Sequence, residues 1–555
     1  MRRLVLGPLL RHVGERTATV WVETDRPGEV TVLDATSPTF TVHGHHYAVV
    51  EIDGLTPGTR TPYDVRLDGE VVWPAGPAFP PSSIRTLDPE RSLRVVFGSC
   101  RKAAVTVATH GTDALSAYAR RLAARPAESA ESDGSAESDG FDGEDGGWPD
   151  ALLLMGDQVY ADTPPEPLRE FIRARRDVTA PPHEEVADFD EYAELYRLAW
   201  TEDSAVRWLL STVPTLMIFD DHDVRDDWNT SYEWRQTMAA QPWWRQRIVS
   251  GLGAYWIYQH LGNLAPAERA ADPVYAAVRA AGEGAGRDAG KIVDEFAERS
   301  DADPDATRWS YALDFGRTRL IALDGRCARV LERDRRAMLS ERHRAWFDAR
   351  CTGGVDHLLI VSSLPYLLPT AIHDAEAWDE ALCAGAWGRR LGRLGERLRQ
   401  GADLEHWAAF QGSFREVAAS LLETVRGDRG AAPASVTILS GDVHYSYLAR
   451  VRGRPIAQVV CSPLRNPLAA QLRRANRIAC VPGLWPPFRW LARAAGVAAS
   501  PFHWRLTEGP WFDNAIATLD IDGRAATVRW ETPADRGMAH LGRAVLSPPS
   551  TAVRP

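Results

Sequence analysis

The chain alternates between short apolar runs and longer segments in which apolar residues recur at helical spacing. Five apolar runs have the length of buried strands: residues 92–100, 152–155, 215–219, 358–363 and 436–439. The segments with helical spacing lie at 103–125, 188–197, 204–210, 241–261, 341–350 and 375–424. Buried strands separated by helices predict an α/β sandwich.

Residues 1–88 follow the period-two alternation of half-buried strands, as at 17–23 and 29–33. The sequence LTPGT at 55–59, followed by Tyr63, resembles the corner of a fibronectin type III sandwich, although that pattern usually has its tyrosine at the position of Thr61. We therefore predict a small all-β domain over 1–88 and a second domain over 89–540. Asp522-Gly523 predicts a late hairpin, and residues 541–555 are predicted to form a flexible tail.

Composition changes this picture at one place. The chain has 555 residues and a formal net charge of −11, but residues 126–147 hold eight of the acidic side chains. Such a run, without apolar anchors, cannot offset its ordering entropy and is predicted to be a disordered insertion. The remaining charge of −3 gives no signature of nucleic-acid binding. No apolar stretch reaches the ~20 residues that span a bilayer, and no export signal is recognisable, so a cytoplasmic protein is expected.

Four of the predicted strands end in residues that can bind metals. These residues are Cys100, Asp157 with Tyr160, the run 220–223, and Asp442 with His444. Each has a simpler interpretation on its own, such as a turn aspartate, a packed aromatic ring, or one of six widely spaced reduced cysteines that form no Cys-x-x-Cys pair. Four such ends on successive buried strands are hard to ascribe to chance, and we expect them to meet at one sheet edge.

The motifs at these ends carry a family resemblance. The GDxxY element, the Asp-His-Asp element and the late Gly-x-x-His are similar to the binuclear metallophosphoesterase pattern of purple acid phosphatases. More specifically, FGSC, GDQVYAD, FDDHDVRDDWN, SSLPY and SGDVHYSY resemble, in this order and over residues 97–467, the alkaline phosphatase D (PhoD-like) family. The resemblance implies a four-layer α/β/β/α sandwich behind the small β-domain.

The resemblance also implies an iron site. Cys100 and Tyr160 would ligate Fe3+, His444 would complete the shell, and Asp157 would bridge the iron to one or two calcium ions. Two departures from the pattern bear on this site. The histidine that many relatives place before the last motif is missing from LLIVSSLPY, and the twin-arginine export signal of secreted relatives is absent. In a reducing cytosol, Fe2+ or Mn2+ is a possible substitute.

The calcium site would be built from carboxylates. Asp221 takes the place of the family's asparagine and Asp442 that of a histidine, and this hardening of the site favours calcium or magnesium over zinc. Asp220 is either a further ligand or a residue that orients its neighbours. The stretch 226–229 is either a further calcium site or a solvated turn, and Arg225, Ser363, His373, Asp374 and Arg465 are candidates for the pocket wall.

The implied activity is hydrolysis of phosphomonoesters or phosphodiesters by metal-activated hydroxide, with a small-molecule phosphoester as substrate. Asp157 and His222 are the predicted catalytic residues. His222 lies between two carboxylates that raise its basicity, which suits it either to stabilise the phosphorane-like charge or to protonate the leaving oxygen. Two alternatives stay open. The aromatic and basic stretch 469–495 is either a lid over the metal edge or a contact for phospholipid headgroups, which would make the protein a phospholipid-directed phosphodiesterase. The other alternative is a non-catalytic binding protein with a vestigial metal site.

Overall fold

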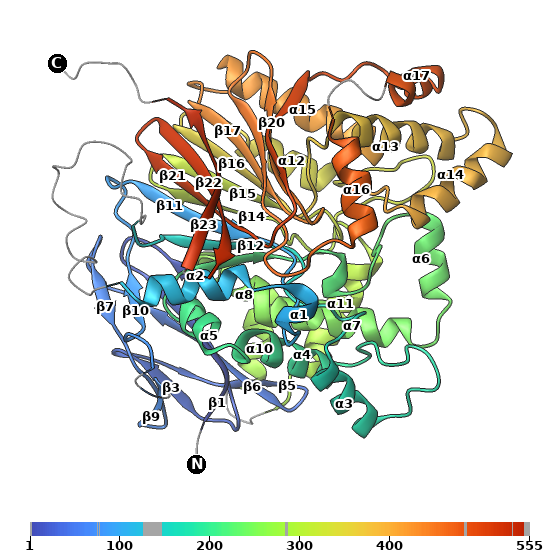
Figure 1. Cartoon of the computed structure of the whole chain (residues 1–555). Helices are drawn as coiled ribbons and strands as arrows, with labels where there is room; N and C mark the ends of the chain where they lie inside the picture. The colour runs from blue at the N-terminus through green and yellow to red at the C-terminus, as the bar shows by residue number, and fades with distance from the viewer. Residues whose placement is uncertain are drawn as a thin grey trace, which may run out of the picture.

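The predicted strands form two stacked sheets in a computed structural model of the chain (Figure 1). The structure describes residues 3–74, 76, 78–125, 147–282, 287–481, 486–535 and 537–548. Nearly all of the acidic insertion, Trp485 and the end of the predicted tail fall outside these residues.

The all-β prediction for the N-terminal region is confirmed. One sheet has the order β1-β2-β6-β5, and its strands are β1 (Leu4–Val13), β2 (Ala18–Thr24), β6 (His45–Ile52) and β5 (Phe40–Val42). A second sheet has the order β4-β3-β8-β9, with β4 (Ala35–Pro38), β3 (Glu29–Val32), β8 (Val65–Leu67) and β9 (Glu70–Trp73). The short strands β7 (Arg60–Pro62) and β10 (Ser83–Arg85) pair with each other. Tyr63, the candidate corner tyrosine, donates its hydroxyl to Ser211 O in the following domain at 2.5 Å.

The first sheet of the second domain has the order β13-β12-β11-β21-β22-β23. Its strands are β13 (Thr215–Ile218), β12 (Ala151–Met155), β11 (Leu93–Gly98), β21 (Ile516–Asp522), β22 (Ala525–Ala534) and β23 (Gly537–Ser547). β11, β12 and β13 are parallel, so their carboxyl ends share one edge. The predicted hairpin at Asp522-Gly523 joins β21 to β22.

The second sheet has the order β14-β15-β16-β17-β19-β18-β20. Its strands are β14 (Tyr311–Phe315), β15 (Thr318–Leu323), β16 (His357–Ser362), β17 (Ser435–Ser440), β19 (Ile456–Val460), β18 (Ser446–Val451) and β20 (Trp504–Trp511). β15, β16, β17 and β19 are parallel.

The alternation of side chains along the strands sorts the core into layers. In β11, Val95 and Phe97 join the core between the two sheets, whereas Val96 joins the core under the first layer of helices. In β16, Leu359 faces the other sheet and Leu358 faces the second helix layer. This arrangement is the expected α/β/β/α sandwich, and it explains why these strands are apolar along their whole length.

The helices of the described residues include those that the sequence predicted, with three changes of boundary, and seven that it did not predict. The helices are α1 (Val107–His110), α2 (Ala114–Ala123), α3 (Glu166–Arg175), α4 (Phe189–Thr201), α5 (Ser204–Leu210), α6 (Tyr232–Ala239), α7 (Trp244–Tyr255), α8 (Leu261–Asn263), α9 (Pro266–Ala270), α10 (Pro273–Gly282), α11 (Gly290–Ala302), α12 (Glu341–Arg350), α13 (Thr370–Cys383), α14 (Arg389–Gly401), α15 (Gln411–Arg426), α16 (Ala470–Ala479) and α17 (Pro486–Ala494). Those that the sequence did not predict are α3, α6, α9, α10, α11, α16 and α17. The predicted helix 103–125 is broken at Gly111 between α1 and α2, and the segment 241–261 contains a π-helical turn, η4 (Trp256–His260).

The segment 375–424 divides into α13, α14 and α15, with the single turn η5 (Trp407–Ala409) before α15. Asp403 begins the break before η5 with a φ of 48°, a left-handed conformation that a helix cannot contain. The prediction of a tail from residue 541 is wrong for 541–547, which belong to β23, paired with β22. An edge strand of half-exposed residues lacks the apolar signal that marks the buried strands.

Arg11 of β1 ties the N-terminal domain to the second domain. This fully buried guanidinium donates to three carbonyl oxygens, Thr215 O at 2.9 Å, Tyr258 O at 2.8 Å and Gln259 O at 2.7 Å. Gln259 in turn donates its Nε2 to Asp223 Oδ1 at 2.9 Å, just beyond the end of β13. Through these contacts the N-terminal domain supports the edge of the sheet at which the predicted ligands lie.

Candidate metal centre

The turns after β11, β12 and β17 hold four predicted ligands in a strained backbone conformation. Cys100, Asp157, Asp442 and His444 have φ values of 56°, 53°, 64° and 57°, in the left-handed region that non-glycine residues rarely adopt. Strain of this kind persists where the surrounding structure enforces it, and it gathers at functional sites.

Gly156 allows the turn after β12 to approach the turn after β13. Its φ is +95°, and a Cβ added there would lie 2.6 Å from Asp220 Cβ. This position of the Gly-Asp motif therefore requires glycine, because any side chain would push Asp157 away from Asp220.

The first set of candidate ligands, which we call the cysteine group, comprises Cys100, Asp157, Tyr160 and His444. Ligand atoms of Cys100, Asp157 and His444 all lie within 4.8 Å of one another. Tyr160 donates its hydroxyl to Asp157 Oδ2 at 3.3 Å and accepts a hydrogen bond from Asn466 Nδ2 at 3.0 Å. The spacing of Asp157 and Tyr160 in the sequence therefore does bring both to one point.

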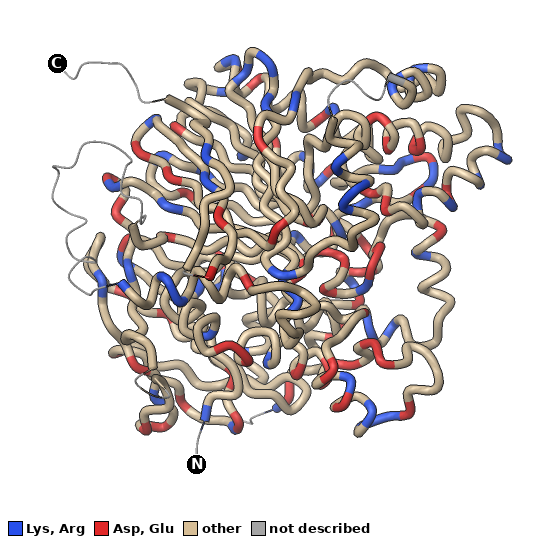
Figure 2. Tube along the Cα trace, in the orientation of Figure 1, with Lys and Arg blue, Asp and Glu red and all other residues tan. Residues whose placement is uncertain are grey.

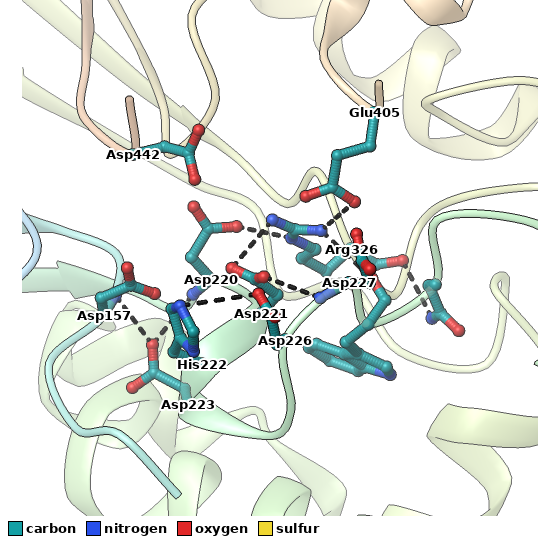
Figure 3. Close-up of polar contacts among 12 residues, drawn as sticks. Asp157, Asp220, Asp221, His222, Asp223, Asp226, Asp227, Arg326, Glu405 and Asp442 are labelled. Carbon is teal, nitrogen blue, oxygen red and sulfur yellow. Dashed lines mark hydrogen bonds and ion pairs between the residues drawn. The ribbon is translucent and has the colours of Figure 1, made fainter. Parts of the chain in front are cut away.

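The second set, the carboxylate group, comprises Asp157, Asp220, Asp221 and Asp442. Carboxylate oxygens of the first three lie within 4.8 Å of one another, and all three side chains are buried. Asp442 comes from the turn after β17 and faces Asp220 (Figure 3). Asp157 belongs to both groups, as a bridging carboxylate would.

Two buried carboxylate oxygens in this cluster lack a protein partner. Within the part of the chain that the structure describes, no hydrogen-bond donor reaches Asp157 Oδ1 or Asp220 Oδ2. A buried acceptor without a donor is costly. A hard cation would satisfy both oxygens, so the residues present fit a metal site.

Burial leaves the thiol, the phenol and the imidazole of the cysteine group uncharged. It raises the pKa of the Cys100 thiol and of the Tyr160 phenol well above their usual values, with Asp157 adding to the effect on both. Burial lowers the pKa of His444 to about 4, so its imidazole is neutral near pH 7. A neutral imidazole is the form that binds a metal.

The carboxylate group rests on a buried arginine that sequence reasoning missed. Arg326, which follows β15, contacts Asp220 Oδ1 through Nε at 2.5 Å and Asp221 Oδ1 through Nη2 at 3.1 Å. Its Nη1 contacts Glu405 Oε2 at 2.6 Å (Figure 3). Burial raises the pKa of Asp220, and Arg326 opposes that rise. Asp220 therefore has features of both a structural residue and a ligand. Arg326 orients one of its carboxylate oxygens, and the other oxygen has no donor within the described part of the chain and is available to a ligand.

Asp442 has a second unpredicted support. His406 lies 2.9 Å from Asp442 Oδ2 through Nε2 and 2.8 Å from Glu376 Oε1 through Nδ1. Between two carboxylates, the pKa of His406 is raised well above its usual value despite burial. His406 lies in the break between α14 and α15. The composition of this stretch predicts a continuous helix, so the sequence would have pointed to His406 only if it had shown where the helix is interrupted.

The main hydrogen-bond partner of His222 is Asp162, which follows β12, whereas the sequence pointed to the neighbouring residues Asp221 and Asp223. Its Nδ1 is 2.8 Å from Asp162 Oδ2, and the negative charges of Asp162 and Asp221 raise its pKa well above the usual value despite desolvation. Asp223 was expected to contribute, but its carboxylate accepts the backbone N–H groups of Asp157 at 3.0 Å and Asp220 at 2.9 Å. Asp223 therefore links the turn that holds Asp157 to the turn that holds Asp220, instead of polarising the imidazole of His222.

The other candidates have structural roles in the described residues. Asp227 N donates to Asp221 Oδ2 at 3.0 Å, and Asn229 Nδ2 donates to Arg326 O at 3.3 Å, which favours the turn interpretation of 226–229. Arg225 pairs with Glu185. The remaining contacts are those of Arg465 Nη2 with Val105 O, Asp374 with Arg489, His373 with the rings of Phe414 and Trp504, and Ser363 O with the N–H of Gly441.

Comparisons with known proteins agree with the motifs. A family model described as PhoD-like phosphatase matches residues 144–471, and one described as a domain of unknown function (DUF7800) matches residues 1–84. A solved structure of PhoD is similar, with a TM-score of 0.56 and 12% identity over 97% of this chain and 88% of the other. A purple acid phosphatase from yellow lupin (Lupinus luteus) seeds gives a TM-score of 0.44 and 11% identity over 99% and 77%. No curated protein matches the sequence.

Proposed function

Because this chain belongs to the PhoD-like phosphatase family, we propose that it is a metal-dependent phosphoesterase that hydrolyses phosphomonoesters, phosphodiesters or both. The observation that carries the proposal is the pair of ligand groups that share Asp157 and leave buried oxygens without a donor. A non-catalytic protein with a vestigial site would have no reason to keep both groups complete at one edge.

The two groups favour different ions. The cysteine group offers a thiol, a phenol, an imidazole and one carboxylate, a set that suits iron, with Mn2+ as a substitute. The carboxylate group offers oxygen only, which suits one or two calcium ions, or Mg2+ in their place. At such a site bound metal supplies Lewis-acid polarisation of the phosphoryl group and lowers the pKa of water towards neutrality.

We assign proton transfer to His222. Asp162 holds its Nδ1 at 2.8 Å, whereas Nε2 lies 3.7 Å from Asp226 Oδ1, so we assign Nε2 as the ring atom that serves the leaving oxygen of the substrate. The His222 side chain is 21% exposed, so a substrate can reach it, whereas Cys100 and Asp157 are buried. Asp162 also stabilises the protonated ring, as a carboxylate partner does in general acid catalysis.

The test is the substitution Asp157→Asn, assayed with nitrophenyl phosphate and bis-nitrophenyl phosphate in the presence of iron and calcium. We expect a loss of at least about a thousandfold in kcat/KM, or about 4 kcal/mol of transition-state stabilisation, and a loss of both metals by elemental analysis. The matched control is Asp356→Asn, a buried carboxylate at the start of β16 that pairs with Arg317 and Arg524. Full activity in Asp157→Asn with a folded protein would reject the assignment.

A further inference from the structure

Helix α14 turns its apolar side chains towards solvent. Leu391, Leu394 and Leu398 are 40%, 56% and 41% exposed, whereas Gly392 and Gly395 are buried. A helix on a soluble protein normally shows the opposite arrangement, with its apolar stripe against the core. The spacing of three and four residues places the leucines on one face.

The inverted arrangement is fixed by close packing against α13. A Cβ at Gly392 would lie 3.2 Å from Leu382 O, and one at Gly395 would lie 3.0 Å from Cys383 Sγ. Only glycine at these two positions lets α14 approach α13 so closely. The leucines therefore cannot rotate inwards without separating the two helices.

The exposed stripe is bordered by positive charge. Arg390, Arg393 and Arg397 are exposed beside the leucines, and residues 387–401 contain five arginines against one glutamate. The chain as a whole has a net charge of −11, so this helix is opposite in sign to the rest of the molecule. Figure 2 shows the basic positions along α14 and α17.

Helix α17 also carries exposed apolar and basic side chains. It also packs against α13, and Trp387 Nε1, just before α14, donates to Ala494 O at its end at 3.4 Å. Trp490 of α17 is 66% exposed, and it lies between Arg489 and Arg493. We call Trp387, α14 and α17 the docking face.

We propose that the docking face binds the surface of an anionic phospholipid bilayer. Leucine and tryptophan side chains would enter the boundary between headgroups and acyl chains, while the arginines contact lipid phosphates, as in interfacial amphipathic helices. Among the described residues no helix is long and apolar enough to cross a membrane. The contact is therefore peripheral, and it goes beyond hydrolysis as such.

The docking face and the metal centre share one helix. α13 packs against both α14 and α17 and contributes Glu376, which contacts His406 beside Asp442. Vesicle binding can be measured without turnover, so its outcome is separate from that of the activity assay.

The experiment is sedimentation of the full chain with vesicles of phosphatidylcholine mixed with phosphatidylglycerol, and with vesicles of phosphatidylcholine alone. We expect the protein to bind the mixed vesicles, and to be released by high salt because screening weakens the arginine contacts. Leu391→Ser with Leu394→Ser should weaken the partition coefficient about tenfold or more, because two apolar side chains no longer enter the lipid.

The matched control is Val71→Ser with Val545→Ser, two strand residues that are 52% and 50% exposed away from the docking face. It should bind vesicles as the unchanged protein does. Failure of the unchanged protein to bind the mixed vesicles would overturn the proposal. A dimer in analytical ultracentrifugation that dissociates on Leu391→Ser with Leu394→Ser would also overturn it, since the face would then be covered by a second copy.

Discussion

The cysteine group and the carboxylate group share Asp157 but obtain their charge in different ways. In the cysteine group, burial keeps the Cys100 thiol and the Tyr160 phenol protonated by raising the pKa of each, and it keeps His444 neutral by lowering its pKa. Neutral hydrogen bonds, such as that of Asn466 to Tyr160, hold these side chains in place.

In the carboxylate group the protein supplies its own cations. Arg326 contacts Asp220 and Asp221, and His406 contacts Asp442. The contact to Asp220 leaves Oδ2 of that carboxylate without a donor among the described residues. This difference indicates that protein charges arrange the carboxylate group before a metal binds. The cysteine group, in contrast, becomes ionic only when a metal displaces its protons.

The largest expected effect comes from removing the guanidinium at the centre of the carboxylate group. Arg326→Leu leaves Asp220, Asp221 and Glu405 buried without it, and breaking a buried pair in this way costs about 3–5 kcal/mol of unfolding free energy. Urea denaturation without and with calcium measures this cost. Calcium should restore more stability to the variant than to the unchanged protein, because the cation replaces the lost charge.

Arg333→Leu is the control for this experiment. Arg333 is 71% exposed and pairs with Glu233 at the surface, so its loss should cost less than about 1 kcal/mol. Equal stabilities of the two variants would mean that Arg326 does not organise the carboxylate group, and the comparison between the groups would fail.

A smaller effect, limited to one group, is expected from His406→Asn. The substitution removes the contact to Asp442 Oδ2 and leaves the cysteine group untouched. Loss of such a supporting residue lowers metal affinity about 10–100-fold. Calcium titration by calorimetry should detect this decrease, while the iron content by elemental analysis stays the same.

His357→Asn is the matched control. His357 is as fully enclosed as His406 and contacts Ser435 Oγ at 2.8 Å and Gly523 O at 3.0 Å, at the far end of β16. It should leave calcium affinity unchanged. A decrease shared by both variants would point to general destabilisation instead of a role of His406 at Asp442.

The sequence was informative wherever the chemistry coincides with a local pattern. Cys100, Asp157 and Asp442 each follow a strand that is buried along all or nearly all of its length, so the apolar run locates the strand and its end locates the ligand. The α/β/β/α layers follow from the same runs together with the family resemblance. β18 and β20 escaped prediction because their polar and aromatic residues give no such run.

The supporting residues could not be predicted because their partners are remote in the chain. Arg326 meets Asp220 across 106 positions, and His406 meets Asp442 across 36. Neither side chain stands out locally, since Arg326 follows a strand end like many polar residues and His406 occupies a stretch of helical composition. Only the folded arrangement distinguishes an arginine that holds two ligand carboxylates from one that forms a surface ion pair.

The smallest expected effect concerns a lysine that lies beside the cysteine group. Lys102 Nζ lies 5.0 Å from the centroid of the Tyr160 ring and donates to Thr163 Oγ1 at 2.9 Å. A cation over an aromatic ring contributes about 0.5–1 kcal/mol, and it favours the ionised phenol that a metal requires. Lys102→Met should therefore weaken iron retention about two- to fivefold in competition with a chelator, while calcium affinity is unchanged.

Lys291→Met, at a lysine that is 88% exposed on α11, is the control and should change neither iron retention nor calcium affinity. A decrease in calcium affinity instead of iron retention would place Lys102 with the carboxylate group and remove the contrast in charge between the two.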